Sequence, residues 1–160
     1  MSSVSTKGLT ETMKMFEKLA GDTDEIVEKA IKEGIGIVTD EMRREISSLK
    51  TSADNEGGKQ KQRYPSKKDV KGLLDSLGFT PVKLNGSKFD IKSGFDGYNT
   101  VITKKYPQGH PNQMIANSIN KGTSFMTAQP FINRTKKVSQ QQAVDAIDKV
   151  ITQEIARITK

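Results

Sequence analysis

The chain has 160 residues, of which 33% are hydrophobic and 28% are charged, a composition that suits one domain with a small core. It contains no run of about 18 apolar residues that could cross a membrane, and its N-terminus lacks the apolar stretch of a secretory signal. Cysteine is absent, which excludes disulfides and thiolate metal sites, and we expect a chain that is made and kept in a cytoplasm.

Positive charge is concentrated in one segment. The chain has 26 Lys and Arg against 19 Asp and Glu, a formal net charge of +7. From Lys50 to Lys71 there are seven basic and three acidic residues, so this segment carries +4 and the rest of the chain +3. Such an excess can indicate an anionic partner such as DNA, RNA or lipid.

The N-terminal region predicts two consecutive amphipathic helices. The first covers 8–20, with Leu9, Met13, Phe16 and Ala20 on one face, and Gly21 closes it. The second starts after a cap at Asp22 or Thr23. Its apolar stripe follows steps of three and four through Val27, Ala30, Ile31, Gly34, Val38, Met42, Ile46 and Leu49.

Gly34 lies on the apolar stripe of this second helix, where glycine costs roughly 1 kcal/mol relative to alanine. Two interpretations stay open. The cost is simply tolerated, or another backbone approaches the helix closely at this position.

The segment after the second helix has no apolar periodicity, so we interpret 50–66 as a long mobile loop. A short helix follows in "KKDVKGLLDSLGF", with Ser66 or Asp69 at its start and Gly78 at its end. Its apolar side contains Val70, Leu73, Leu74 and Leu77.

The period then changes to that of β-strands. Strands are predicted in "FTPVKL", "KFDIKSGF" and "YNTVITKKY", joined by a hairpin turn at 85–87 and a second turn at 95–99. We expect them to form an antiparallel meander. The segment "YPQGHP" is predicted to be a loop.

Two helices are predicted in the C-terminal part. A short one covers 112–120 and ends near Gly122. The last begins either at a capping box of Ser139 and Gln142 or earlier, soon after Pro130. The predicted apolar positions of the last helix are Val144, Ile147, Val150 or Ile151, Glu154 or Ile155, and Ile158. The fold class is α+β, one domain over 1–160: an antiparallel sheet of three to four strands packed by a long N-terminal and a C-terminal helix.

No residue pattern indicates catalysis. His110, the only histidine, lies between Gly109 and Pro111, and its sequence neighbourhood offers no orienting carboxylate, so we interpret it as a solvated loop residue. The carboxylate pairs Asp24–Glu25 and Asp145–Asp148 fall on polar helix faces. "GTSFMT" lacks the glycine and lysine spacing of a phosphate-binding loop. We expect no enzyme activity, no cofactor and no metal.

The segment "NKGTSFMTAQPFINRT", residues 120–135, has a structural interpretation. Gly122 lets the backbone turn sharply out of the preceding helix, and Thr123 can bond locally and hold that corner. After Pro130, Phe131 and Ile132 are expected to anchor the final helix against the sheet. Residues 124–129 would then form an exposed ridge with a defined conformation, suited to contact a neighbouring subunit.

The order of these features resembles the tail-completion or head–tail joining proteins of tailed bacteriophages, which are often described as minor tail components. The matching features are "EGIGIVTDEM" in a long helix, "GLLDSL", "IKSGF" before the short helix, and "KGTSFMTAQPFI". The family has a glutamate and an aromatic residue before Gly-Thr, whereas this chain has Asn120 and Lys121.

The resemblance implies a structural virion protein: a ring of identical subunits, six in number, that joins the tail to the DNA-filled head at the neck. Its implied partners are copies of itself, adjacent neck or connector proteins, and tail-tube or tail-terminator proteins, with no membrane. Its implied interface motif is Gly122, Thr123, Pro130, Phe131 and Ile132. The protein would be assembled in the cytoplasm of the bacterial host and located in the virion.

The basic segment leaves an alternative open. The chain could be a small nucleic-acid-binding module that uses the 50–71 loop, because a few phosphate contacts give a salt-dependent affinity. In a ring, the same loop would order on an adjacent layer or face the DNA in the channel. The candidate partner-facing or DNA-facing residues are Lys59, Lys61, Arg63, Lys67 and Lys68.

Overall fold

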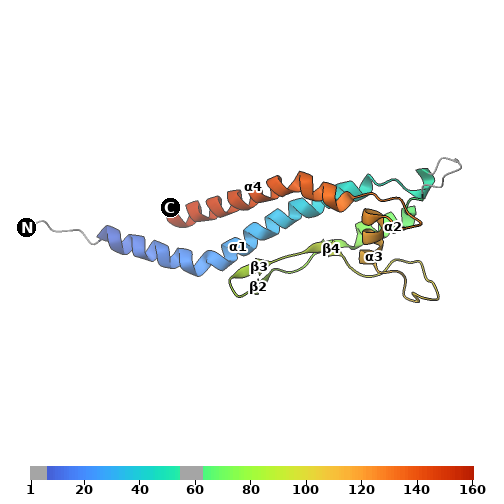
Figure 1. The fold of residues 1–160 in the computed structure, drawn as a ribbon. Coiled ribbons are helices and arrows are strands. Elements are labelled where there is room, and N and C mark those ends of the chain that lie inside the picture. Colours follow the sequence, from blue (N-terminus) through green and yellow to red (C-terminus); the bar gives the residue numbers. More distant parts are fainter. Residues whose placement is uncertain (1–6, 55–62) are drawn as a thin grey trace, which may run out of the picture.

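The computed structural model describes residues 7–54 and 63–160 and confirms the α+β class. Two long helices, α1 (Lys7–Ser47) and α4 (Phe131–Thr159), lie side by side and run in opposite directions. A short 3₁₀ turn, Ser52–Asp54, follows α1. The short helices α2 (Lys67–Ser76) and α3 (Asn112–Lys121) and four short strands pack near one end of this pair, which gives an elongated molecule (Figure 1).

The prediction of two separate N-terminal helices was wrong. α1 is continuous from Lys7 to Ser47 and passes through Gly21 without a break. Gly21 is exposed, and a Cβ added to it would meet no atom within 4 Å. A helix-interior glycine costs only about 1 kcal/mol, too little to end a helix whose two flanking segments both favour helical structure.

α1 and α4 pack through residues that recur mainly every four positions, several of which are small. On α4 the buried positions include Phe131, Thr135, Ser139 and Ala143, each four residues after the last. α1 presents Ala30 and Gly34, with Met42 and Ile46 further along, again in steps of four. Small side chains such as Ala30, Gly34, Ser139 and Ala143 let the two helix axes approach closely.

Ion pairs at the two ends of the contact fix its antiparallel register. Arg134 near the start of α4 binds Glu45 near the end of α1, with 2.6 Å between Nε and Oε2. Lys29 of α1 binds Glu154 near the end of α4. Because α4 ends five residues after Glu154, the part of α1 before about residue 24 extends beyond α4, as Figure 1 shows. We call residues 7–23 the α1 overhang.

The strands form two separate antiparallel ladders and not one meander. β1 (Leu77–Phe79) pairs with β4 (Ser93–Phe95), and β2 (Lys83–Asn85) pairs with β3 (Lys88–Asp90). The predicted hairpin turn is confirmed, with Gly86 at φ +64°. The predicted strand at 98–106 was wrong, because this segment is a loop that has only an isolated bridge between Tyr98 and Pro111.

The start of α2 is confirmed at the predicted cap. Ser66 Oγ accepts a hydrogen bond from the Asp69 backbone N at 3.1 Å, and Asp69 accepts one from the Ser66 backbone N at 3.2 Å. This capping box satisfies amides that the first helical turn leaves free. α2 ends at Ser76, before Gly78, which lies within β1.

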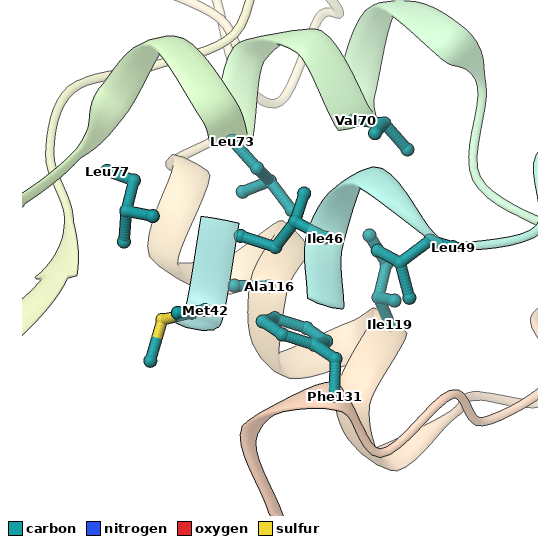
Figure 2. Packing of buried hydrophobic residues seen from close by; sticks show 9 residues of the cluster. All are labelled: Met42, Ile46, Leu49, Val70, Leu73, Leu77, Ala116, Ile119 and Phe131. Atoms are coloured by element: carbon teal, nitrogen blue, oxygen red, sulfur yellow. The ribbon is translucent and has the colours of Figure 1, made fainter. Parts of the chain in front are cut away.

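The apolar core sits where the end of α1 meets α2, α3 and the start of α4 (Figure 2). Phe131 is fully buried there, and its ring meets the ring of Phe95 in β4 edge to face, with 6.2 Å between centroids. Partly buried apolar residues, including Ile132, surround the cluster. The core residues are Met42, Ile46, Leu49, Val70, Leu73, Leu77, Ala116, Ile119 and Phe131.

Of the two predicted starts for the final helix, the earlier one is confirmed. α4 begins at Phe131, immediately after Pro130. Ser139 is no cap: it is buried within the helix, and its hydroxyl donates to the Thr135 carbonyl at 2.8 Å. The predicted stripe was partly wrong, because Val144 and Ile155 are exposed whereas Glu154 and Ile158 are buried.

Candidate functional site

The Gly-Thr corner is a tight, well-defined turn between α3 and α4. Gly122 has φ +76° and ψ 169°, a backbone region that is essentially restricted to glycine. Thr123 and Met126 then exchange backbone hydrogen bonds of 2.9 and 3.3 Å. The Thr123 hydroxyl accepts from the Phe125 amide at 3.1 Å. The turn presents Phe125 to solvent, with 71% of the residue exposed.

The start of α4 is capped by a side chain from the preceding helix. Pro130, at the N-cap, has no side chain that could bond to the free amides of the first turn. Asn120 of α3 supplies the missing acceptor, because its Oδ1 accepts from the Ile132 amide at 3.0 Å. Asn120 thus links the end of α3 to the first turn of α4, a role that no short-range sequence signal indicates.

This turn also holds together the two ends of the basic segment. The Gln129 amide accepts from the Lys50 backbone N at 2.9 Å and donates to the Lys50 carbonyl at 3.0 Å. Thr127 N donates to the Arg63 carbonyl at 3.0 Å, and Ser52 N donates to that of Pro65 at 2.8 Å. The structure therefore brings the two predicted sites, the 120–132 motif and the base of the basic loop, into direct contact.

The described basic residues of the candidate set lie around this contact. Arg63, Lys67 and Lys68 are exposed, whereas Lys59 and Lys61 lie outside the described residues. Arg63 lines a surface hollow of about 420 Å³ together with the turn residues 123–127. The Lys50 ammonium lies 5.9 Å from the centre of the Tyr64 ring, a cation–π contact at the base of the loop.

The geometry around His110 does not assemble a catalytic site. Its ring stacks against the Tyr106 ring at 4.4 Å between centroids, and its backbone N donates to Asn99 Oδ1 at 2.8 Å. In the described part of the chain, neither a carboxylate hydrogen bond nor an ion pair is seen at its imidazole. Among these residues, no group of three or more His, Asp and Glu is placed to hold a metal ion.

Two buried carboxylates lie along α1 and α4. Glu154 binds Lys29 and Arg157, and the hydrogen bond from Lys29 is the main cause that lowers the pKa of Glu154. Glu41 binds Arg44 through Oε2 at 2.5 Å, a hydrogen bond that raises the pKa of Arg44. The other oxygen of Glu41 is buried without a hydrogen-bond partner. Both carboxylates stand at the helix–helix contact, away from the 120–132 turn.

Across the described ranges 7–54 and 63–160, no helix is long and apolar enough to span a bilayer. Comparison of the chain with protein-family models, with curated proteins and with solved structures found no match.

Proposed function

We propose that this protein is a structural component of a tailed-phage or prophage virion, in which identical subunits form a ring at the head–tail interface. The observation that carries the proposal is the exposure of large apolar side chains from elements throughout the fold. Phe125 in the turn and Ile102 in the 98–110 loop are each 71% exposed, and Phe16 in α1 is 62% exposed. These side chains are available for burial against neighbouring subunits when the protein assembles.

The shape of the molecule supports the same proposal. The ordered turn at 122–130 and the α1 overhang lie at opposite ends of an elongated subunit (Figure 1). A subunit with different contact surfaces at separate places can form a closed ring when the rotation between neighbours closes. The Gly-Thr turn gives one of these surfaces a fixed conformation, because backbone hydrogen bonds hold it to α3 and to Arg63 and the Gln129 side chain holds it to Lys50.

Sedimentation of the purified protein, followed by electron microscopy of any oligomer, tests this proposal. We expect ring-shaped oligomers, either alone or after mixing with the neck and tail-tube proteins encoded beside its gene. The proposal fails if the protein stays monomeric with every such partner and virions that lack it still join heads to tails.

A second candidate function, nucleic-acid binding, is favoured by one observation. Arg63 and the exposed Phe125 line the same hollow, so a cation and an aromatic ring are presented together. Single-stranded nucleic acid is bound by such combinations, through phosphate contacts and base stacking. The test is retention of DNA at low salt, and its absence removes this candidate.

A further inference from the structure

We infer that the 98–110 loop is a contact surface for duplex DNA, in which Lys104 and Lys105 bind phosphates and Ile102 enters the minor groove. This inference rests on the second candidate function, nucleic-acid binding, and adds to it a surface outside the basic segment 50–71. The loop projects from the end of the molecule that also carries α2 and α3 (Figure 1).

Asn99 holds the base of this loop in one conformation. Its backbone N donates to the His110 carbonyl at 2.8 Å, and its Oδ1 accepts from the backbone amides of His110 and Val101 at 2.8 and 3.1 Å. Its side-chain amide donates to Asp69 Oδ1 at 3.0 Å, which ties the loop to the start of α2. Gly109 makes room for this arrangement, because a Cβ there would overlap the Asn99 carbonyl oxygen. The loop is therefore a fixed part of the surface.

The tip of the loop is a turn whose two central residues are lysines. Thr103 and Tyr106 exchange backbone hydrogen bonds of 3.1 Å in both directions and so close the turn around Lys104 and Lys105. Both lysines are exposed, and in the described chain neither forms an ion pair with a carboxylate. Two adjacent ammonium groups repel each other, and a partner that supplies anions to both removes this repulsion.

The positive surface continues from the loop to α2. Lys67 and Lys68 are exposed in the first turn of α2, beside Asp69, which binds the base of the loop. Two nearby carboxylates are already engaged: Asp69 caps α2, and Asp96 accepts from the next backbone amide at 2.7 Å. Four ammonium groups from the loop and from α2 thus lie at one end of the molecule, and a chain of phosphates is the partner that complements them.

The side chains around the lysines favour duplex DNA over a single strand or a bilayer. Ile102 precedes the turn and is 71% exposed, and proteins that bind the minor groove insert apolar side chains of this kind between base pairs. The Tyr106 ring packs on His110, with 4.4 Å between centroids, and the Lys105 ammonium lies 5.5 Å from its centre, so unpaired bases gain no free ring there. Ile102 and Val101 bury too little apolar surface to hold a protein on a bilayer.

Fluorescence anisotropy of full-length variants on a short duplex tests the phosphate contacts. Lys104→Gln/Lys105→Gln should lower the affinity roughly tenfold at about 0.1 M salt and should reduce the slope of log affinity against log salt by up to about 2. Lys83→Gln/Lys88→Gln is the matched control, because it removes the same charge from exposed positions of β2 and β3, and its effect should be much smaller. Losses of the same size in both variants would overturn the inference.

Ile102→Ala tests the groove contact separately from charge. It should lower the affinity at least about threefold and leave the salt slope unchanged, because it removes apolar contact surface but no phosphate contact. Ile102→Leu should stay within about twofold of the natural protein. Val144→Ala, at an apolar residue of α4 that is 53% exposed, is the control and should have no effect. An unchanged affinity of Ile102→Ala would overturn the groove contact.

The outcomes separate this inference from the function on which it rests. If the natural protein binds duplex DNA and the loop variants bind it as tightly, the inference is wrong and nucleic-acid binding stands. If the natural protein binds no DNA at low salt, both are wrong. Flotation with vesicles of phosphatidylcholine and phosphatidylserine measures the other anionic partner, and vesicle binding that needs Ile102 and Lys104 in a protein that binds no duplex would show that the loop contacts a bilayer. Circular dichroism of each variant excludes loss of the fold as the cause.

Discussion

Gly34 of α1 lies directly against Ile147 of α4. A Cβ built on Gly34 would lie 2.7 Å from both Cδ1 and Cγ1 of Ile147 and 3.4 Å from the Ala143 carbonyl oxygen. Of the two interpretations of this glycine, close approach is therefore the correct one. What approaches most closely is a side chain, with the α4 backbone behind it.

Gly34→Ala should lower the free energy of unfolding by about 1 kcal/mol. Overpacking against Ile147 costs roughly 1–3 kcal/mol, and alanine regains about 1 kcal/mol of helix propensity. Gly36→Ala is the matched control, because a Cβ there would meet no atom within 4 Å. That change should raise stability by about 0.5–1 kcal/mol. Urea unfolding measures both, and equal shifts in one direction would contradict the close packing.

Substitution of two phenylalanines, one in the core and one in the exposed turn, is predicted to have very different effects on stability. Phe131→Ala should lower the free energy of unfolding by roughly 3–5 kcal/mol, because the side chain is fully buried against Phe95. Phe125→Ala, at a residue that is 71% exposed, should change it by less than about 0.5 kcal/mol. If Phe131→Ala does not fold, Phe131→Leu still allows the comparison by thermal unfolding. Similar effects at the two positions would contradict the assignment of the core.

Gly122 is predicted to be harder to replace than Gly86, the glycine of the hairpin turn. In Gly122→Ala the new Cβ would lie 2.9 Å from the Ala128 N and 3.1 Å from the Met126 carbonyl oxygen, in a backbone conformation that only glycine adopts readily. We expect a loss of more than about 2 kcal/mol. Gly86→Ala is the control, since its φ is +64° but its Cβ would meet no atom within 4 Å. It should cost only about 1–2 kcal/mol by urea unfolding.

The ion pair between the buried Glu154 carboxylate and the exposed Lys29 predicts a specific dependence of stability on pH. The hydrogen bond from Lys29 lowers the pKa of Glu154 below 4.5, so the folded state favours the ionised carboxylate. Its stabilising contribution is therefore full above pH 4.5 and is lost as the pH falls through the folded-state pKa.

Glu154→Gln should remove this part of the acid sensitivity. The difference in unfolding free energy between the natural protein and the variant should be largest near neutral pH and should shrink as the pH falls below 4.5. Asp40→Asn, at an exposed residue of α1 outside any ion pair in the described chain, serves as the control. Urea unfolding at pH 7 and pH 3 gives the measurement, and a pH-independent difference would contradict the role of the pair.

The elements that sequence reasoning located well are those with local causes. Ser66 and Asp69 cap α2 through hydrogen bonds between residues that are only three positions apart. Gly86 indicates the hairpin turn because that turn needs a residue with positive φ, which glycine adopts readily. The prediction that a helix ends at Gly21 was wrong, because the cost of one glycine is small beside the summed helical propensity of the segments on its two sides.

The contacts that assemble the candidate site could not be predicted, because their partners are distant in sequence. Gln129 binds the backbone of Lys50, 79 positions away, and Asn120 caps a helix that begins on the far side of the turn. Nothing near either residue distinguishes it from an ordinary exposed amide. Strand pairing failed for a related reason: the 98–106 segment has β-branched residues, but it joins neither of the two ladders, and a strand partner is not specified by local sequence.

The second candidate function makes a prediction that two lysine pairs can test. If Lys67 and Lys68 contact phosphates beside Arg63, Lys67→Gln/Lys68→Gln should weaken binding to duplex DNA and reduce the slope of log affinity against log salt by up to about 2. Lys136→Gln/Lys137→Gln removes the same charge from exposed adjacent positions of α4, away from the turn, and should have a much smaller effect. Fluorescence anisotropy over a range of salt concentrations measures both. Because the two variants have equal net charge, equal losses would mean that DNA responds only to the overall charge of the protein, and the basic segment would then have no special part in binding.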